Sequence, residues 1–188
     1  VSPAYTPGLE GTPNELKLKY LADNEFADLS GDELREAISA GVGRIVVDSR
    51  IELARVSEIA GELGVEQAIY MRITPGVEAD THEYIRTGCE DSKFGFTPEE
   101  TFERACEIAE IQGVSVNGLM CVAPICEKES EIRSIFSNMH QLFIDIRDKK
   151  IDNINMSVLS MGMSGDYKQA ILEGANLVRI GSAIFGAR

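Results

Sequence analysis

The sequence has no tryptophan, only two histidines and four cysteines, and no two cysteines form a Cys-x-x-Cys pair. Structural zinc sites use closely spaced Cys and His ligands, whereas His82 and His140 lie far apart in this chain. We therefore expect no metal site. The cysteines are interpreted as reduced, incidental thiols of a cytoplasmic protein; they are Cys89, Cys106, Cys121 and Cys126.

Long hydrophobic runs are also absent. No apolar stretch approaches the roughly 20 residues of a membrane-spanning helix, and the first residues lack the basic-then-apolar order of a signal peptide. The net charge of −13 and the pI of about 4.6 would repel nucleic acid and anionic membranes. We expect a cytoplasmic protein that binds neither, and its 188 residues, 44% of them hydrophobic, are enough for one globular domain.

Short apolar strands alternate with amphipathic helices along most of the chain. We predict strands at 44–48, 67–73, 114–122, 153–160 and 177–180. Capping residues and helical stripes predict helices after Ser30, Ser49, Thr97, Glu129 and Asp166, and a last one starts at Ser182. Continuously apolar strands that alternate with helices are typical of parallel βα units.

The number of strands falls short of a closed barrel. A (β/α)8 barrel needs eight strands, and we count about five. We therefore predict an α/β fold, a partial or truncated (β/α)8 TIM-type barrel over residues 30–188. Residues 1–29 are interpreted as an irregular segment with a short helix at 14–23. An incomplete barrel exposes an apolar edge, which predicts self-association.

The most informative segments are two Gly/Ser turns that follow the last two strands. The first is Leu159-Ser160-Met161-Gly162-Met163-Ser164-Gly165-Asp166, and the second is the stretch from Leu177 to Gly186. A strand that runs into such a turn before a helix presents backbone N–H groups and a hydroxyl at the positive end of the helix dipole. The last two βα loops of a barrel often bind phosphate in this way. Tight βα turns without a ligand are the alternative for each turn alone, but the pair favours an anion site.

Arg179 stands between these two turns in an otherwise apolar strand. Burying a guanidinium without a partner is costly. It either pairs with Asp48 or Asp166 as a structural group or faces a ligand at the rim of the barrel.

The C-terminal part of the chain, from about residue 118 to residue 188, resembles the pyridoxal phosphate homeostasis protein family. The matching segments are Gly118-Leu119-Met120-Cys121-Val122-Ala123-Pro124, the segment from Leu159 to Asp166, and Val178-Arg179-Ile180-Gly181-Ser182-Ala183-Ile184-Phe185-Gly186. This resemblance implies a barrel like the N-terminal domain of alanine racemase that binds pyridoxal 5′-phosphate (PLP) in the cytoplasm without an established turnover. It implies that Ser164, Gly181 and Ser182 hold the phosphate and that Arg179 lies by the pyridine ring; Met161 and Gly162 are assigned to the same cofactor site.

The middle of the chain, about residues 30–97, resembles diaminopimelate decarboxylase, which uses the same kind of PLP barrel. The resemblance rests on Arg44-Ile45-Val46-Val47-Asp48-Ser49, on the segment from Arg72 to Ile85, on Thr87-Gly88 and on Asp91-Ser92-Lys93-Phe94-Gly95. The two resemblances meet near residues 98–118. A recombined or designed barrel is therefore one interpretation of the chain.

The chain departs from both families at the cofactor's covalent anchor. Both attach PLP through a lysine at the end of the first barrel strand, and none of the seven lysines follows such a strand. Lys17 and Lys19 fit a solvated helix, Lys93 fits a loop, and His82 fits a polar loop rather than a catalytic role. The decarboxylases' stacking histidine and second β domain are missing as well. We therefore expect noncovalent PLP binding without catalytic residues; the alternatives are a PLP-dependent amino-acid decarboxylase and an inactive barrel fragment or engineered chimera.

Overall fold

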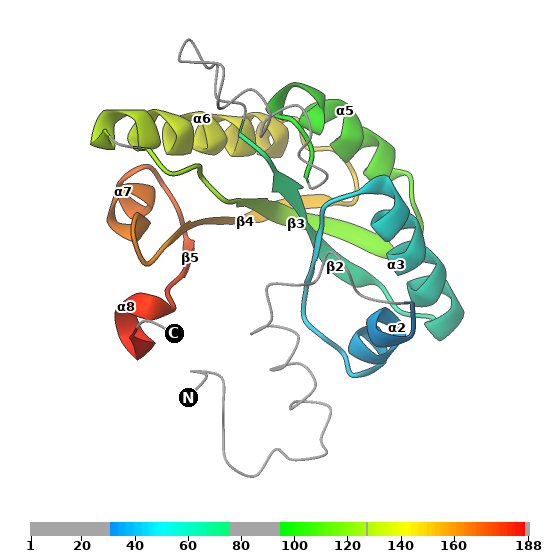
Figure 1. Cartoon of the computed structure of the whole chain (residues 1–188). Coiled ribbons are helices and arrows are strands. Elements are labelled where there is room, and N and C mark those ends of the chain that lie inside the picture. Colours follow the sequence, from blue (N-terminus) through cyan, green and yellow to red (C-terminus); the bar gives the residue numbers. More distant parts are fainter. Residues whose placement is uncertain (1–30, 76–94, 127, 187–188) are drawn as a thin grey trace, which may run out of the picture.

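The protein forms a single curled sheet of parallel strands in the computed structural model, which describes residues 31–75, 95–126 and 128–186 (Figure 1). The strands are β1 (Ile45–Val47), β2 (Gln67–Ile73), β3 (Val114–Cys121), β4 (Ile154–Met163) and β5 (Leu177–Arg179). They lie side by side in chain order, and every neighbouring pair is parallel. Five parallel strands in this order confirm the predicted partial barrel.

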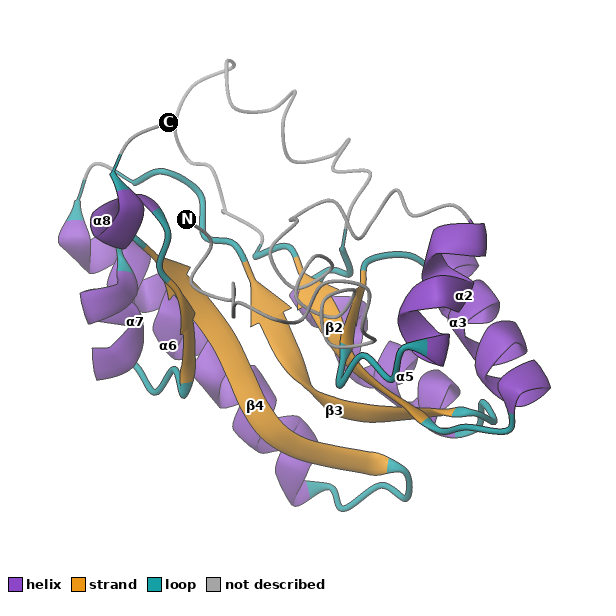
Figure 2. Ribbon diagram, turned by 90° about the horizontal axis from the view of Figure 1, so that it is seen from below, coloured by secondary structure: helices purple, strands orange, loops and turns teal. Residues whose placement is uncertain are grey.

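The helices lie together on one side of the sheet (Figure 2). They are α2 (Gly31–Ser39), α3 (Arg50–Leu63), α5 (Pro98–Ala109), α6 (Glu129–Asp148), α7 (Tyr167–Leu172) and α8 (Ser182–Phe185). A doubly wound sheet reverses its strand order and carries helices on both faces. Consecutive strand order with helices on one side is instead the winding of a (β/α) barrel.

The helix ends follow from local sequence. Ser49 accepts a hydrogen bond from the Glu52 backbone N–H at the start of α3, and Gly64 ends that helix in the left-handed region at φ 64°. Thr97 and Glu100 form a complete capping box before α5, with Pro98 in the first turn. These caps satisfy amide groups that have no partner inside the helix, so the predicted starts of both helices are confirmed.

The core fills the space between the sheet and the helices. Strand residues such as Val47, Ile69 and Leu119 are fully buried. On the helix side they are met by fully buried Val56 of α3 and Phe136 of α6. This burial explains why the strands read as nearly continuous apolar runs in the sequence.

Strands β3 and β4 approach each other closely at Gly118. A Cβ atom placed there would lie 2.1 Å from the carbonyl oxygen of Val158. The pairing of β3 with β4 shifts register just before this glycine, between Val116 and Gly118. Only a residue without a side chain fits between the two backbones.

The structure differs from the sequence expectation at the end of β4. We expected this strand to end at Ser160, but it continues to Met163, which pairs with Arg179 of β5. Gly162 has φ 92°, and a register shift separates Ser160 from Met163. The strand therefore passes through an irregularity that only glycine adopts readily, and pairing resumes beyond it.

Several expectations lie outside the described residues. They concern the irregular segment 1–29, the helix at 14–23, the cap at Ser30, and the side chains of Lys17, Lys19, His82, Cys89 and Lys93. Among the helices that the structure describes, none has the length and apolar character needed to cross a membrane.

Candidate functional site

The turns after β4 and β5 meet at the carboxyl end of the sheet. The hydroxyl oxygen of Ser164 accepts hydrogen bonds from the backbone N–H groups of Gly181 and Ala183, each at 3.1 Å. These two amides flank Ser182, the first residue of α8. Two N–H donors of the turn after β5 thus point at one oxygen of the turn after β4. The sequence predicted that these two turns lie together; that they bind an anion there stays a prediction.

The β4 turn is held rigidly in front of α7. The backbone N–H of Met163 donates to Asp166 Oδ1 at 2.5 Å, and the Asp166 N–H donates back to the Met163 carbonyl at 3.1 Å. A Cβ on Gly162 would lie 2.5 Å from the Cβ of Ala170. Glycine at this position lets α7 pack against the strand end, and that packing fixes where Ser164 stands.

Arg179 joins three strands instead of pairing with a carboxylate. Its Nη1 donates to the carbonyl and to the hydroxyl of Ser160 at 3.0 and 2.6 Å, and its Nη2 donates to the carbonyl of Cys121 at 2.8 Å. Of the two alternatives for Arg179, pairing with Asp48 or Asp166 is therefore wrong, and contact with a ligand stays a prediction. The reason is that β4 lies between β5 and β3. The guanidinium therefore contacts Ser160 within β4 and reaches past it to the carbonyl of Cys121, the last residue of β3.

Burial sets the charge state of this region. It lowers the pKa of the Arg179 guanidinium, and the nearby carboxylate of Asp166 opposes that change. Arginine remains protonated in proteins even so. Burial also raises the pKa of the Cys121 thiol to about 12, which leaves it an inert thiol at neutral pH and agrees with its interpretation as incidental.

A second polar cluster, absent from the sequence-based site, lies at the ends of β1 and β2. Asp48 follows β1 and is almost fully buried; its Oδ2 lies 3.6 Å from Nη1 of Arg72 in β2. Its backbone N–H donates to Glu52 Oε2 at 3.0 Å. Burial, reinforced by the charge of Asp48, raises the pKa of Glu52 to about 8. The Asp-Ser-x-x-Glu spacing was the available signal, because positions i and i+4 face each other at a helix start.

The structure places the six expected cofactor residues in two groups. Ser164, Gly181 and Ser182 lie at the meeting point of the two turns, and Arg179 ends β5 just before Gly181, with its guanidinium on Ser160 of β4. Met161 and Gly162 are buried within β4, and Met161 belongs to the hydrophobic core. Direct contact of a ligand with Ser164, Gly181 and Ser182 stays a prediction that the geometry favours. Met161, in contrast, packs in the hydrophobic core.

The lysines that the structure describes are all exposed; they are Lys128, Lys149, Lys150 and Lys168. Lys149 and Lys150 follow α6 at the opposite end of the sheet from the two turns, and Lys149 lies over the ring of Phe102 at 5.6 Å. Lys128 pairs with Glu131 at 3.2 Å. A Schiff-base lysine needs a lowered pKa from burial or neighbouring charge, and none of these four exposed side chains has that burial.

Comparison with known proteins finds one family model that spans most of the chain. Residues 28–170 match the model described as "Pyridoxal-dependent decarboxylase, pyridoxal binding domain". A diaminopimelate decarboxylase of Mycobacterium bovis is 54% identical over 68 residues, which cover 36% of this chain and 15% of that protein. A pyridoxal phosphate homeostasis protein of Helicobacter pylori is 39% identical over 111 residues, which cover 58% of this chain and 47% of that protein. The chain thus spans less than half the length of these curated relatives.

Solved structures show the same fold. The structure of PipY from Synechococcus elongatus PCC7942 with PLP bound has a TM-score of 0.66 and 26% identity, and the match covers 85% of this chain and 68% of that one. A diaminopimelate decarboxylase from M. jannaschii in complex with L-lysine has a TM-score of 0.67 at 20% identity, and the match covers 92% of this chain and 47% of that one. The second likeness concerns the fold alone.

Proposed function

The chain belongs to the family of the pyridoxal-dependent decarboxylase pyridoxal-binding domain, and from this premise we propose that it binds PLP in the manner of the homeostasis proteins. The cofactor phosphate lies at the last two βα turns, held by Ser164, Gly181 and Ser182, with Arg179 beside the ring. The name of the H. pylori relative and the PLP in the PipY structure support this assignment. We also propose that the protein acts in the cytoplasm, with PLP as its partner.

One observation carries the proposal. The amides of Gly181 and Ala183 converge on a single oxygen, that of Ser164. Phosphate oxygens are stronger acceptors than a hydroxyl because they are charged. An arriving phosphate takes over both amides, and the Ser164 hydroxyl, released from them, turns its own proton toward it. The donor set therefore fits the phosphate end of PLP.

The described residues do not fit a covalent anchor for the aldehyde end of the cofactor. Bound PLP supplies an electron sink for reactions at amino-acid carbons, but that chemistry requires a lysine poised at the aldehyde. The four described lysines are exposed and lie on helix ends or surfaces. We therefore propose noncovalent binding by these residues, without catalysis.

A titration with PLP tests the phosphate cradle. We expect saturable binding to the full chain, and about tenfold or greater weakening by Ser164→Ala, because a hydrogen bond to a charged group contributes roughly 1.5–3 kcal/mol. Ser157→Ala is the matched control, since Ser157 donates to the Asn117 carbonyl near the start of β4. Equal dissociation constants for Ser164→Ala and the unmodified chain would contradict the proposed site.

A PLP-dependent decarboxylase is the second candidate. The 54% identity over 68 residues to the diaminopimelate decarboxylase of M. bovis favours it. Borohydride reduction separates the two functions, because only an aldimine with lysine becomes irreversibly attached. A covalently labelled chain that releases carbon dioxide from diaminopimelate supports the decarboxylase, whereas reversible PLP binding without label supports the homeostasis-type role.

The edge of the sheet at β5 supports a further proposal, self-association. The flanking helices expose large apolar side chains, namely Ile171, Leu172, Ile184 and Phe185. Exposed large apolar side chains that gather in one patch mark interaction sites, and these four lie on the two helices next to β5, an edge strand of the described sheet. Sedimentation of the chain with and without Leu172→Glu tests this: we expect a dimer or larger species that the charge dissociates, and a monomer in both samples contradicts it.

A further inference from the structure

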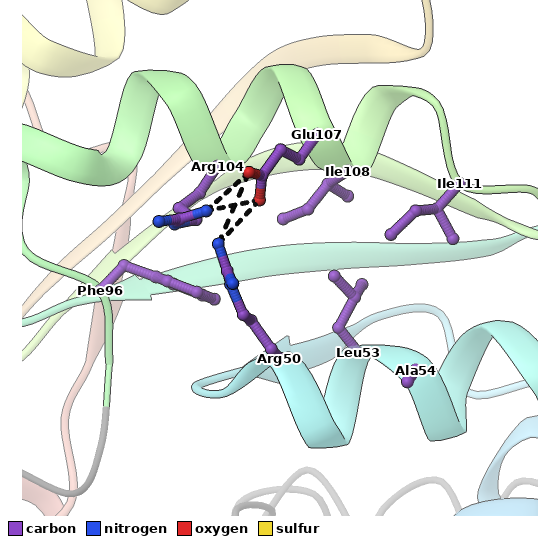
Figure 3. A pocket seen from close by; sticks show the side chains of 8 residues that line it. All are labelled: Arg50, Leu53, Ala54, Phe96, Arg104, Glu107, Ile108 and Ile111. Carbon is purple, nitrogen blue, oxygen red and sulfur yellow. Dashed lines mark hydrogen bonds and ion pairs between the residues drawn. The ribbon is translucent and has the colours of Figure 1, made fainter.

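A pocket between α3 and α5 lies outside the proposed cofactor site. It has a volume of about 240 Å³. Eight residues line it; they are Arg50, Leu53, Ala54, Phe96, Arg104, Glu107, Ile108 and Ile111 (Figure 3). The two helices that form it cover the outside of the sheet, whereas the two Gly/Ser turns lie at the ends of β4 and β5.

One end of the pocket carries an unequal set of charges. Arg104 holds Glu107 in a close bidentate pair, at 2.7 and 2.6 Å to its two carboxylate oxygens. Arg50 reaches the same carboxylate from α3 with longer contacts, at 3.5 and 3.1 Å (Figure 3). Two guanidinium groups thus share one carboxylate, which leaves this end of the pocket with one excess positive charge. The protein as a whole has a net charge of −13.

Of the two arginines, Arg50 is the one held more weakly by Glu107. Its side chain is 63% exposed, against 19% for Arg104. Its contact with Glu107 is a loose surface pair, and such pairs contribute little to stability. A ligand that brings a second carboxylate can therefore take Arg50 while Arg104 keeps Glu107 in place.

The rest of the pocket is apolar. Leu53 of α3 and Ile108 of α5 are buried and lie toward each other, with Ile111 further along the same wall (Figure 3). Phe96 closes the end beside the arginines. The volume is below the roughly 300–1,000 Å³ typical of sites for drug-sized ligands, so a metabolite-sized molecule fits better than a large one.

We propose that this pocket binds a small monocarboxylate with a branched aliphatic tail. The tail packs against Leu53, Ile108 and Ile111, and the carboxylate receives the planar guanidinium fork of Arg50. A monoanion matches the single excess charge. A cationic ligand is repelled by the two arginines. A dianion binds less well than a monoanion because its second negative charge has no positive partner in the pocket.

The test uses 4-methylpentanoate, its neutral amide and acetate as probes of the full chain. Titrations are followed by NMR shifts of the methyl groups of Leu53, Ile108 and Ile111, which report on this pocket directly. We expect 4-methylpentanoate to bind at least about tenfold more tightly than the amide, which lacks the charge. Acetate, which lacks the tail, is expected to bind most weakly. Equal shifts with acid and amide overturn the carboxylate contact, and no shift with any probe overturns the site.

Two exposed substitutions separate the parts of the site without disturbing the core. Arg50→Gln is expected to remove the preference for acid over amide, whereas Arg147→Gln, the same charge change in a pair with Asp148 at 3.0 Å elsewhere, leaves it intact. Ala54→Leu fills the apolar part and is expected to abolish binding of both probes. Unchanged binding in Ala54→Leu, or an unchanged acid preference in Arg50→Gln, contradicts the proposal.

Discussion

The buried carboxyl of Glu52 predicts a pH-dependent stability that one substitution removes. Its pKa is raised from 4.5 to about 8, mainly by burial. Because the folded-state value lies above the ordinary one, the stability contributed by this group is complete below about pH 4.5. It is lost as the pH rises through about 8. Glu52→Gln keeps an acceptor for the Asp48 backbone N–H and cannot ionise, so it should abolish this loss.

The magnitude follows from the size of the pKa change. At about 1.4 kcal/mol per pKa unit, the difference between 4.5 and about 8 corresponds to at most roughly 5 kcal/mol of unfolding free energy. The residue is only 6% exposed, and the figure is an upper bound because the shift is shared with the neighbouring Asp48. A change of that size is comparable to the whole stability of many small domains, which is roughly 5–15 kcal/mol.

Urea unfolding measured between pH 5 and pH 9 checks the prediction. The free energy of unfolding of Glu52→Gln minus that of the unmodified protein should grow from pH 5 to about pH 8 and level off above it. Titrating groups that do not interact with Glu52 cancel in this difference, whereas Asp48, whose charge acts on Glu52, contributes to it. Glu58→Gln is the matched control, because Glu58 lies on the exposed face of α3, and its difference should stay flat. Parallel pH profiles for Glu52→Gln and the unmodified protein would refute the reasoning.

The remaining predictions concern stability and are checked by urea or thermal unfolding. Gly118→Ala should prevent normal pairing of β3 with β4, because its Cβ would lie 2.1 Å from the Val158 carbonyl oxygen; Gly61→Ala on α3, where nothing lies within 4 Å of the added Cβ, should instead stabilise by about 0.5–1 kcal/mol. Phe136→Ala removes a fully buried ring and should cost about 3–5 kcal/mol. Thr97→Ala removes the α5 capping box and should cost about 1 kcal/mol.

The sequence was a good guide wherever local signals and burial agreed. The capping residues Ser49 and Thr97 gave the starts of α3 and α5 because their side chains satisfy amides that no helix can satisfy itself. The apolar strands were recognisable because helices and sheet enclose them. The two resemblances meet at α5, and the strands before and after it, β2 and β3, still pair in parallel along their length, with one register shift between Ile69 and Tyr70. Each βα unit adds its strand next to the strand that precedes it in the chain. A chain whose two halves resemble different families of the same barrel can therefore still form one sheet.

The sequence was a poor guide where a contact depends on which strands are neighbours. The length of β4 is set by its pairing with β5 beyond Gly162, and an apolar pattern contains no information about a partner strand. The sequence suggested a carboxylate or a ligand as the partner of Arg179, whereas the structure supplies the oxygens of Ser160 and Cys121. Every residue has a backbone carbonyl, so the sequence cannot indicate which carbonyl Arg179 contacts. Only the order of the strands shows that those of Ser160 and Cys121 lie near its guanidinium.

The hydroxyl of Ser164 has a consequence for ligand discrimination. In the proposed PLP complex, the phosphate replaces the Ser164 hydroxyl, which already accepts hydrogen bonds from both amides. The gain is then the difference between the two acceptors together with the hydrogen bond that the released hydroxyl donates to the phosphate. A dephosphorylated vitamer such as pyridoxal offers nothing better than the serine it would displace, whereas a charged ester does. In the proposed complex, Ser164 would therefore make the affinity for PLP higher than the affinity for its unphosphorylated precursors.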